Sequence, residues 1–139
     1  MSPPVVSPAG VAASRRMGGE VRALLTPATV RATAGFLGTL TLAPGEFMAA
    51  HRHPYSEEFL YVAAGDIVVR IDGEAVRARR GEAVFVARDA EHRIENVGDA
   101  EALVVFGIGP LAPSPELGHV DAEPVPFPDQ APPAVGGRR

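Results

Sequence analysis

The sequence predicts an all-β protein, a small antiparallel β-barrel or jelly-roll sandwich that forms a single barrel domain. Short stretches of alternating apolar and polar residues recur between residues 36 and 109, and glycine-containing turns separate them. Helical periodicity is almost absent. The 139 residues suffice for one hydrophobic core but not for two. Apolar residues make up 46% of the chain, so we expect it to fold rather than to stay disordered.

Composition divides the chain into three parts. Residues 1–19 are rich in Pro, Ala, Gly and Ser without periodicity, which predicts a flexible N-terminal arm. Residues 20–123 are expected to form the barrel domain, including a C-terminal segment after Leu111 that wraps around it. Prolines return in that segment, and residues 124–139 are expected to be a disordered tail.

Two segments open the expected barrel. Residues 21–26 form a short apolar stretch that ends at Pro27. Around residues 36–42 apolar side chains alternate with threonines, which is typical of a half-buried strand. Its apolar face carries Phe36, Leu40 and Leu42, and its polar face carries Thr39 and Thr41.

A hairpin is the clearest of the later elements. Residues 66–71 and 74–80 flank Asp72-Gly73, a pair suited to the left-handed positions of a two-residue turn. The total of about eight short strands predicts an antiparallel sandwich or barrel. The other strands are expected at residues 46–53, 57–65, 82–87, 91–98 and 101–109, the last an apolar run typical of burial on both faces.

Composition also excludes several functions. Without cysteine there is no disulfide framework, thiolate metal site or cysteine nucleophile, and without lysine there is no Schiff base. The net charge of -4, with no basic stripe, argues against nucleic acid as a partner. No long uncharged apolar run and no secretory signal are present, so we expect no membrane span and a cytoplasmic location.

Two histidines stand one residue apart in a chain that has only four. Since residues two apart on a strand share a face, His51 and His53 are expected to project together, with Phe47 and Ala49 beside them. An isolated pair of this kind is more often a polar face than a metal site.

Two neighbouring strands make a metal site the better interpretation. They offer Glu58 and His92, and imidazole nitrogens with a carboxylate oxygen are ligands of zinc and other divalent transition metals. The sequence therefore predicts one divalent metal per chain. Alternation sends Glu57 to the opposite face, as a solvated carboxylate at the rim. The predicted ligands are His51, His53, Glu58 and His92.

Apolar neighbours give the expected pocket its character. A largely apolar cavity around one ion suits a flat, apolar or aromatic ligand better than a sugar phosphate. Simple core packing is the competing interpretation for most of these side chains. Tyr55, in the turn after His53, could orient a substrate through its hydroxyl or could merely pack. The expected pocket residues are Phe36, Phe47, Leu60, Val62, Ile94 and Phe106.

Glycine spacing around the histidines resembles the two sequence motifs of the cupin superfamily. The first motif runs from Gly45 through His51-X-His53 and Glu58 to Gly65, with the cupin spacing throughout. The second runs from Gly81 through His92 to Asn96, but Ala87 and Asp89 stand where cupins usually have proline and glycine. The resemblance implies a small β-barrel with the metal inside its open end, and the departures put the loop shape in doubt.

The stretches "HPYSEEFLYV" and "PLAPSPELGHVDAE" are similar to a narrower family, the polyketide-synthesis cupins of the tetracenomycin and resistomycin type. The resemblance runs from about Arg16 to Glu123. It implies a homodimeric, metal-dependent cyclase of antibiotic pathways, often with zinc. Such an enzyme closes a ring in a poly-β-ketone intermediate by aldol chemistry of the lyase or isomerase kind. Polyketide synthase components are further expected partners.

Within this resemblance His119 lies in the C-terminal stretch. It could act as an acid, a base or a further ligand, or could be a surface histidine. Two other functions stay open. The same donor set serves iron-dependent oxygenases as readily as a zinc Lewis acid, with manganese and nickel also compatible. A barrel without catalysis could bind an apolar ligand as an accessory to a synthase.

Overall fold

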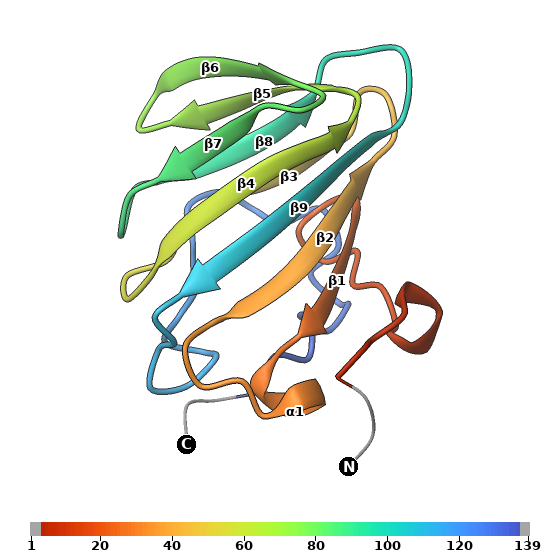
Figure 1. Cartoon of the computed structure of the whole chain (residues 1–139). Coiled ribbons are helices and arrows are strands. Elements are labelled where there is room, and N and C mark those ends of the chain that lie inside the picture. The colour runs from red at the N-terminus through yellow and green to blue at the C-terminus, as the bar shows by residue number, and fades with distance from the viewer. Residues whose placement is uncertain (1–3, 137–139) are drawn as a thin grey trace.

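Two five-stranded antiparallel sheets pack face to face in the computed structural model of the chain, which describes residues 4–136 (Figure 1). The predicted all-β fold is confirmed. The strands are β1 (Glu20–Leu25), β2 (Phe36–Leu42), β3 (Phe47–Arg52), β4 (Glu57–Ala64), β5 (Asp66–Ile71), β6 (Glu74–Arg79), β7 (Ala83–Val86), β8 (His92–Asn96), β9 (Ala102–Gly109) and β10 (Val120–Asp121).

The strand order is β1-β2-β9-β4-β7 in one sheet and β10-β3-β8-β5-β6 in the other. Consecutive strands such as β3 and β4 therefore lie in different sheets. The predicted β5–β6 hairpin is present, and its turn residues Asp72 and Gly73 have φ of 48° and 85°. Both angles lie in the left-handed region, as a two-residue turn of this kind requires.

Helical structure is confined to short pieces in the described chain. A 3₁₀ turn covers Pro8–Gly10, and α1 is one turn over Pro27–Val30. The helix α1 has a reciprocal cap, in which the Thr29 N–H donates to the Thr26 hydroxyl and the Thr26 N–H donates to the Thr29 hydroxyl. No helix in residues 4–136 is long and apolar enough to cross a membrane.

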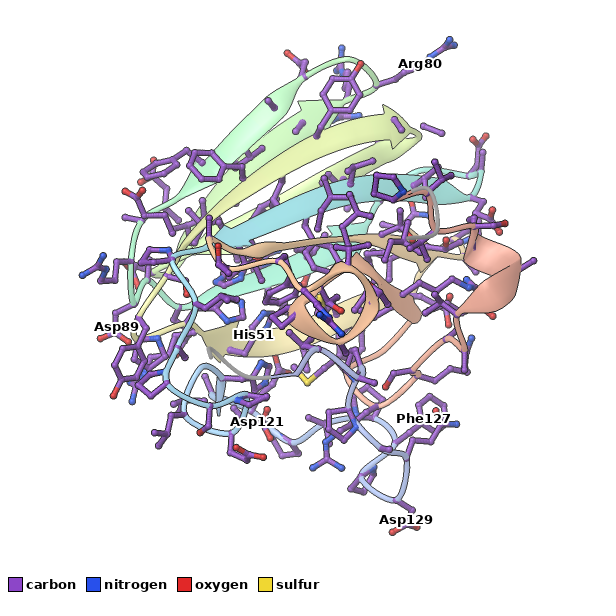
Figure 2. The ribbon with its side chains drawn as sticks, turned by 60° about the horizontal axis from the view of Figure 1, so that its bottom comes forward. His51, Arg80, Asp89, Asp121, Phe127 and Asp129 are labelled. Atoms are coloured by element: carbon purple, nitrogen blue, oxygen red, sulfur yellow. The ribbon has the colours of Figure 1, made fainter. Side chains whose placement is uncertain are left out.

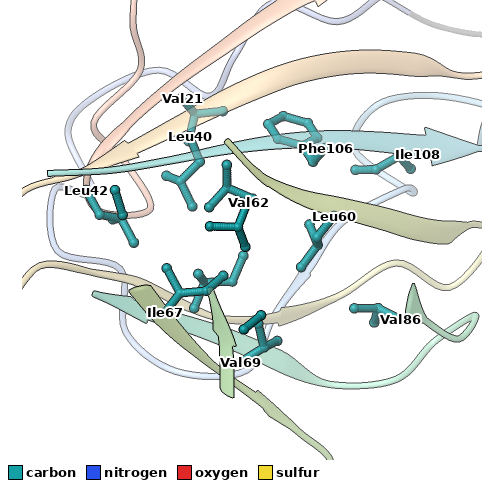
Figure 3. Close-up of a cluster of buried hydrophobic side chains, with 14 of the residues drawn as sticks. Val21, Leu40, Leu42, Leu60, Val62, Ile67, Val69, Val86, Phe106 and Ile108 are labelled. Carbon is teal, nitrogen blue, oxygen red and sulfur yellow. The ribbon is translucent and has the colours of Figure 1, made fainter. Parts of the chain in front are cut away.

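The core lies between the two sheets (Figure 3). Strand β4 shows the alternation that builds it, because its exposed and buried residues follow each other one by one over the first six positions. The inward side chains of both sheets meet in one apolar cluster, and the most deeply buried include Leu40, Leu42, Leu60, Val62, Ile67, Val69, Ile94 and Val104.

The N-terminal segment differs from the expected flexible arm. Ser14 and Met17 are buried, Ser14 pairs with Val21, and the Ala49 N–H donates to the Met17 carbonyl at 2.7 Å. Residues 14–19 therefore pack on the barrel. The buried Met17 and the backbone bridge from Ser14 to Val21 fix the position of this segment, which its composition alone does not predict.

The expected disordered tail also has defined contacts over residues 124–136. Arg16 donates to the carbonyls of Pro128 and Gln130, and the Ser14 hydroxyl donates to the Ala131 carbonyl at 2.6 Å. The two ends of the chain thus run side by side. Residues 1–3 and 137–139, which the same expectations included, lie outside the described residues.

Candidate metal centre

Four side chains from both sheets converge at one end of the barrel. His51 lies on β3, His53 directly follows that strand, Glu58 lies on β4 and His92 on β8. Each offers one ligand atom, and these atoms all lie within 4.8 Å of one another. All four residues are buried, and Figure 2 shows His51 inside the molecule and Asp89 at its edge. The structure thus brings together the four ligands predicted from the sequence.

A β-bulge in β3 aims the first histidine inward. Met48 pairs with Ile94 and His51 pairs with His92. Between these two pairs β3 advances by three residues and β8 by two. Residues three apart would lie on opposite faces of a regular strand, so the bulge is what lets both Met48 and His51 face the interior. Phe47 consequently points outward, where the guanidinium of Arg93 lies 3.8 Å from its ring centre.

Backbone carbonyls orient the three imidazoles. The Nδ1–H groups of His51, His53 and His92 donate to the carbonyls of Ala49, Gly118 and Ala90, at 2.7, 3.0 and 3.0 Å. A proton on Nδ1 leaves the lone pair of each neutral ring on Nε2. Metal-binding histidines are commonly held in this way, with the second nitrogen free for the ion.

Polar atoms at the centre of the cluster lack hydrogen-bond partners. Nε2 of His53, Nε2 of His92 and one carboxylate oxygen of Glu58 are buried and unpartnered. His53 and His92 approach the Glu58 oxygens at 3.3 and 3.5 Å, without hydrogen-bond geometry. Buried polar atoms without partners are costly. A divalent cation between them would satisfy all three, so these residues fit a metal site.

Electrostatics favour a cation at this position. Burial lowers the pKa of His51 well below its usual value, which keeps this imidazole neutral and able to bind a metal. Burial alone would raise the pKa of Glu58, but the two close imidazoles outweigh it and hold the pKa below its usual range. Burial lowers the pKa of His92 while Glu58 raises it by more. A buried carboxylate therefore stabilises positive charge beside it.

A cavity of about 140 Å³ with largely apolar walls adjoins the cluster, where His51, His53 and Glu58 line it. Phe36, Leu60, Ile94 and Phe106 line it, as the sequence predicts. Phe47 and Val62, which were also expected in the pocket, are not among the described residues that line it. The bulge turns Phe47 outward, and Val62 lies two residues farther along β4 than Leu60, in the core. Tyr55 is 41% exposed and is also absent from the lining.

The fold and this site can be compared with known proteins. Residues 38–107, about half of the chain, match the sequence profile of the cupin domain. The chain belongs to the cupin family. It is 58% identical over 132 residues to the "Tetracenomycin polyketide synthase protein TcmJ" of Streptomyces glaucescens, covering 95% of this chain and 89% of that protein. It is 49% identical over 123 residues to the "Polyketide synthase CurC" of Streptomyces cyaneus, covering 88% and 80%.

A solved structure supports the same fold for this cupin. The protein from Thermotoga maritima described as a "predicted oxalate decarboxylase" superposes with a TM-score of 0.66 at 24% sequence identity. The match covers 77% of this chain and 99% of that one. At this identity the likeness concerns the architecture and not the reaction.

The second cupin motif keeps its loop despite the unusual residues. Asp89, where glycine is usual, has φ of 64°, and its N–H donates to the His53 carbonyl at 3.0 Å. Aspartate tolerates this left-handed conformation better than most residues. The side chain also pairs with Arg52 at 3.3 Å. The departure from the motif therefore leaves His92 in place.

His119 lines the cavity, with about a third of its side chain exposed. Its ring stacks on His51 with centres 4.8 Å apart and planes 15° apart, and its Nε2 contacts the Asp121 carboxylate at 2.7 Å. Burial lowers the pKa of His119 despite that contact. The backbone of Asp121 pairs with His51 across β10 and β3. Sequence reasoning missed Asp121, although an acid two residues from a histidine is a visible signal.

Proposed function

We propose that this cupin is a metal-dependent cyclase that closes a ring in a poly-β-ketone intermediate of aromatic polyketide synthesis. The observation that carries the proposal is the cluster of three imidazoles and one carboxylate, with unpartnered donor atoms, facing an apolar cavity. The names of the relatives from Streptomyces glaucescens and Streptomyces cyaneus, both polyketide synthase proteins, supply the substrate class. Zinc is the proposed ion, on donor set alone.

For this reaction the chain mainly has to position the substrate and the ion. An α-carbon joins a carbonyl carbon, the proton leaving the α-carbon ends on the former carbonyl oxygen, and loss of water aromatises the ring. A bound divalent ion would supply Lewis acidity to a carbonyl oxygen. His51, His53, Glu58 and His92 would hold that ion.

The other walls of the cavity select the geometry of closure. Phe36 and Phe106 meet edge to face with centres 6.1 Å apart, and with Ile94 they form a rigid apolar surface. Such a surface holds a flexible chain in one folded form and keeps water and competing closures out. His119, fixed by Asp121 at the cavity, is our candidate for moving the proton.

Elemental analysis of the purified protein, with ring closure assayed without dioxygen, tests the proposal. We expect about one zinc per chain and anaerobic turnover of a poly-β-ketone substrate. The matched variants are Tyr55→Phe, which we expect to be active, and His119→Phe, which we expect to retain metal and lose turnover. An active His119→Phe variant would remove that residue from the mechanism while leaving the metal site in place.

Two outcomes would overturn the cyclase. Native iron with a strict requirement for dioxygen would favour an oxygenase, since the same four donors serve iron. Ligand binding that survives removal of the metal, without turnover, would indicate an accessory binding protein. The expected homodimer stays a prediction, which the mass of the purified protein in solution would check.

A further inference from the structure

The cavity beside the metal centre is small for the proposed substrate. Its volume is about 140 Å³. An engineered protein cavity of roughly 150 Å³ accommodates benzene, and pockets for larger ligands usually span about 300–1,000 Å³. The space therefore holds one six-membered ring. A poly-β-ketone intermediate has the length of several rings, so one wall has to move before more than one ring can lie inside.

Most of the walls are fixed by the fold. The strands contribute side chains that belong to hydrogen-bonded ladders and to the core. The loop from Leu111 to His119 is tied to the metal centre, because the Gly118 carbonyl accepts from His53 and the adjoining β10 pairs with β3. Moving either wall would disturb the site itself.

A further wall is the segment Ala131–Gly136, which we call the strap. Pro133, Val135 and Gly136 line the cavity, yet the strap belongs to no strand. Two hydrogen bonds hold it to the rest of the described chain, from the Ser14 hydroxyl to the Ala131 carbonyl and from the Ala28 N–H to the Val135 carbonyl. Pro132 and Pro133 lack the N–H that a ladder needs.

The chain just before the strap is held more firmly. Gln130 accepts through its side chain from the Arg15 N–H at 2.9 Å and through its carbonyl from Arg16 at 3.0 Å. The Phe127 N–H donates to the Arg16 carbonyl, and Arg15 lies over the Phe127 ring at 5.6 Å. A firmly anchored base followed by a weakly bonded tip is the arrangement of a hinged flap.

We propose that the strap is a movable wall that determines which substrates reach the metal centre. In place, it limits the cavity to a ligand of one ring. Displaced about Gln130, it admits a longer chain of fused or unfused rings. The proposal rests on the proposed function only for the identity of that ligand, a β-diketone larger than the cavity.

A reversible disulfide can lock the strap. A Cβ built on Gly136 would lie 3.3 Å from the Ala28 Cβ, a little below the separation of about 3.5–4.5 Å in disulfides, and a cysteine there would also have to adopt the φ of 81° of Gly136. Ala28 is exposed, and the chain has no cysteine of its own, so the double variant Ala28→Cys/Gly136→Cys can form one internal disulfide. Reduction of the same protein restores the free strap and is the matched control.

The measurement is ligand binding to the Co²⁺-substituted protein, followed by the visible absorption of the metal. Acetylacetone is the small β-diketone and dibenzoylmethane the large one. We expect acetylacetone to bind the oxidised and reduced forms equally. We expect dibenzoylmethane to bind the oxidised form at least about tenfold more weakly, with recovery on reduction. This contrast would separate a strap that gates by size from one that only adds stability.

Equal binding of dibenzoylmethane to the oxidised and reduced forms would overturn the strap proposal and leave the cyclase untouched. Failure of acetylacetone to perturb the bound Co²⁺ would instead overturn the proposed function, and the strap proposal with it. A chain ending at Gln130 provides a second test, which needs no cysteine at Gly136. We expect dibenzoylmethane to associate with it about tenfold faster than with the full chain, and equal rates would refute the gate.

Discussion

The two ends of the barrel interior treat buried polar groups in opposite ways. On β8, His92 at one end and Asn96 at the other are both buried and both face inward. The Asn96 amide donates to the carbonyls of Leu42 and Ala100 and accepts from Gly98, each at 2.9 Å. At the metal centre, Nε2 of His92 has no partner.

This contrast separates residues that serve the fold from residues that serve function. At the far end, each hydrogen bond of the Asn96 side-chain amide joins it to a loop or to the end of a strand. This buried amide therefore contributes to stability. At the metal end, donors with unmet bonding capacity cost stability, by about 1–3 kcal/mol for each buried group. Natural proteins retain unpartnered buried polar groups where a bound ligand interacts with them and offsets the loss of stability. Variants at the two ends can test this difference.

The largest effect is expected from removing two ligands together. In His51→Ala/His53→Ala we expect metal affinity to fall by a factor on the order of 10⁴, because two of four donors are lost. Elemental analysis after dialysis should find about one ion per chain in the parent protein and almost none in the variant. A variant that retains its full metal content would contradict the assigned site.

At the far end, Asn96→Ala should destabilise the protein by about 3 kcal/mol. The substitution leaves the carbonyls of Leu42 and Ala100 and the Gly98 N–H without their hydrogen-bond partner in the interior. Urea unfolding measures this change. Metal content per folded chain should stay that of the parent protein. A loss of metal without a loss of stability would show that the two ends are not separable.

The neighbours Glu58 and Glu57 lie on one strand but on opposite faces, and only Glu58 is buried. Glu58→Gln should weaken metal binding about 100-fold, because a neutral amide replaces a carboxylate in a site that favours a cation. Glu57→Gln is the matched control and should bind metal like the parent protein. Competition with a chelator measures both, and equal weakening in the two variants would exclude a specific role for Glu58.

The smallest effect concerns Glu123, which accepts from the Ala50 N–H at 2.6 Å within the β3 bulge and pairs with Arg93. Burial alone would raise the pKa of Glu123, but Arg93 and the Ala50 N–H lower it below its usual value. Its contribution to stability is therefore present above the pKa of the unfolded state and is lost as the pH falls through the folded-state pKa.

Glu123→Gln should accordingly cost about 1 kcal/mol at neutral pH and progressively less in acid. Urea unfolding from pH 7 down to pH 3 follows this change. A cost that stays constant over that range would indicate that packing, and not charge, connects Glu123 to the bulge.

The clustering of the four donors and the sheet faces could be predicted from the sequence because both follow from spacing. Residues two apart share a face, and glycine turns limit each strand, so Glu58 and His92 could be assigned from the sequence alone. The bulge escaped prediction because Ala49 and Ala50 are small, apolar and compatible with either face. Phe47 was therefore expected in the pocket, and the structure places Met48 there.

The terminal segments escaped prediction for a different reason. Proline-rich chain without periodicity looks the same whether it is free or docked, because its contacts run through backbone carbonyls and a few side chains. Arg16, Ser14 and Gln130 make those contacts, and each is an ordinary polar residue in an irregular segment. The surface on which such a segment packs, and not the segment's own sequence, determines where it lies.

The bulge in β3 gives this strand one residue more than alternation alone requires. Deleting Ala49 or Ala50 would change no ligand and would restore strict alternation along β3. Met48 and His51 would then stand two residues apart, and alternation alone would place both on the inner face. The deletion would instead remove a backbone contact, because the Ala49 N–H donates to the Met17 carbonyl and the Ala50 N–H donates to the Glu123 carboxylate. The extra residue therefore serves to dock Met17 and Glu123 on the metal strand, and a deletion scan at these two alanines should disturb that docking and not the inward direction of His51.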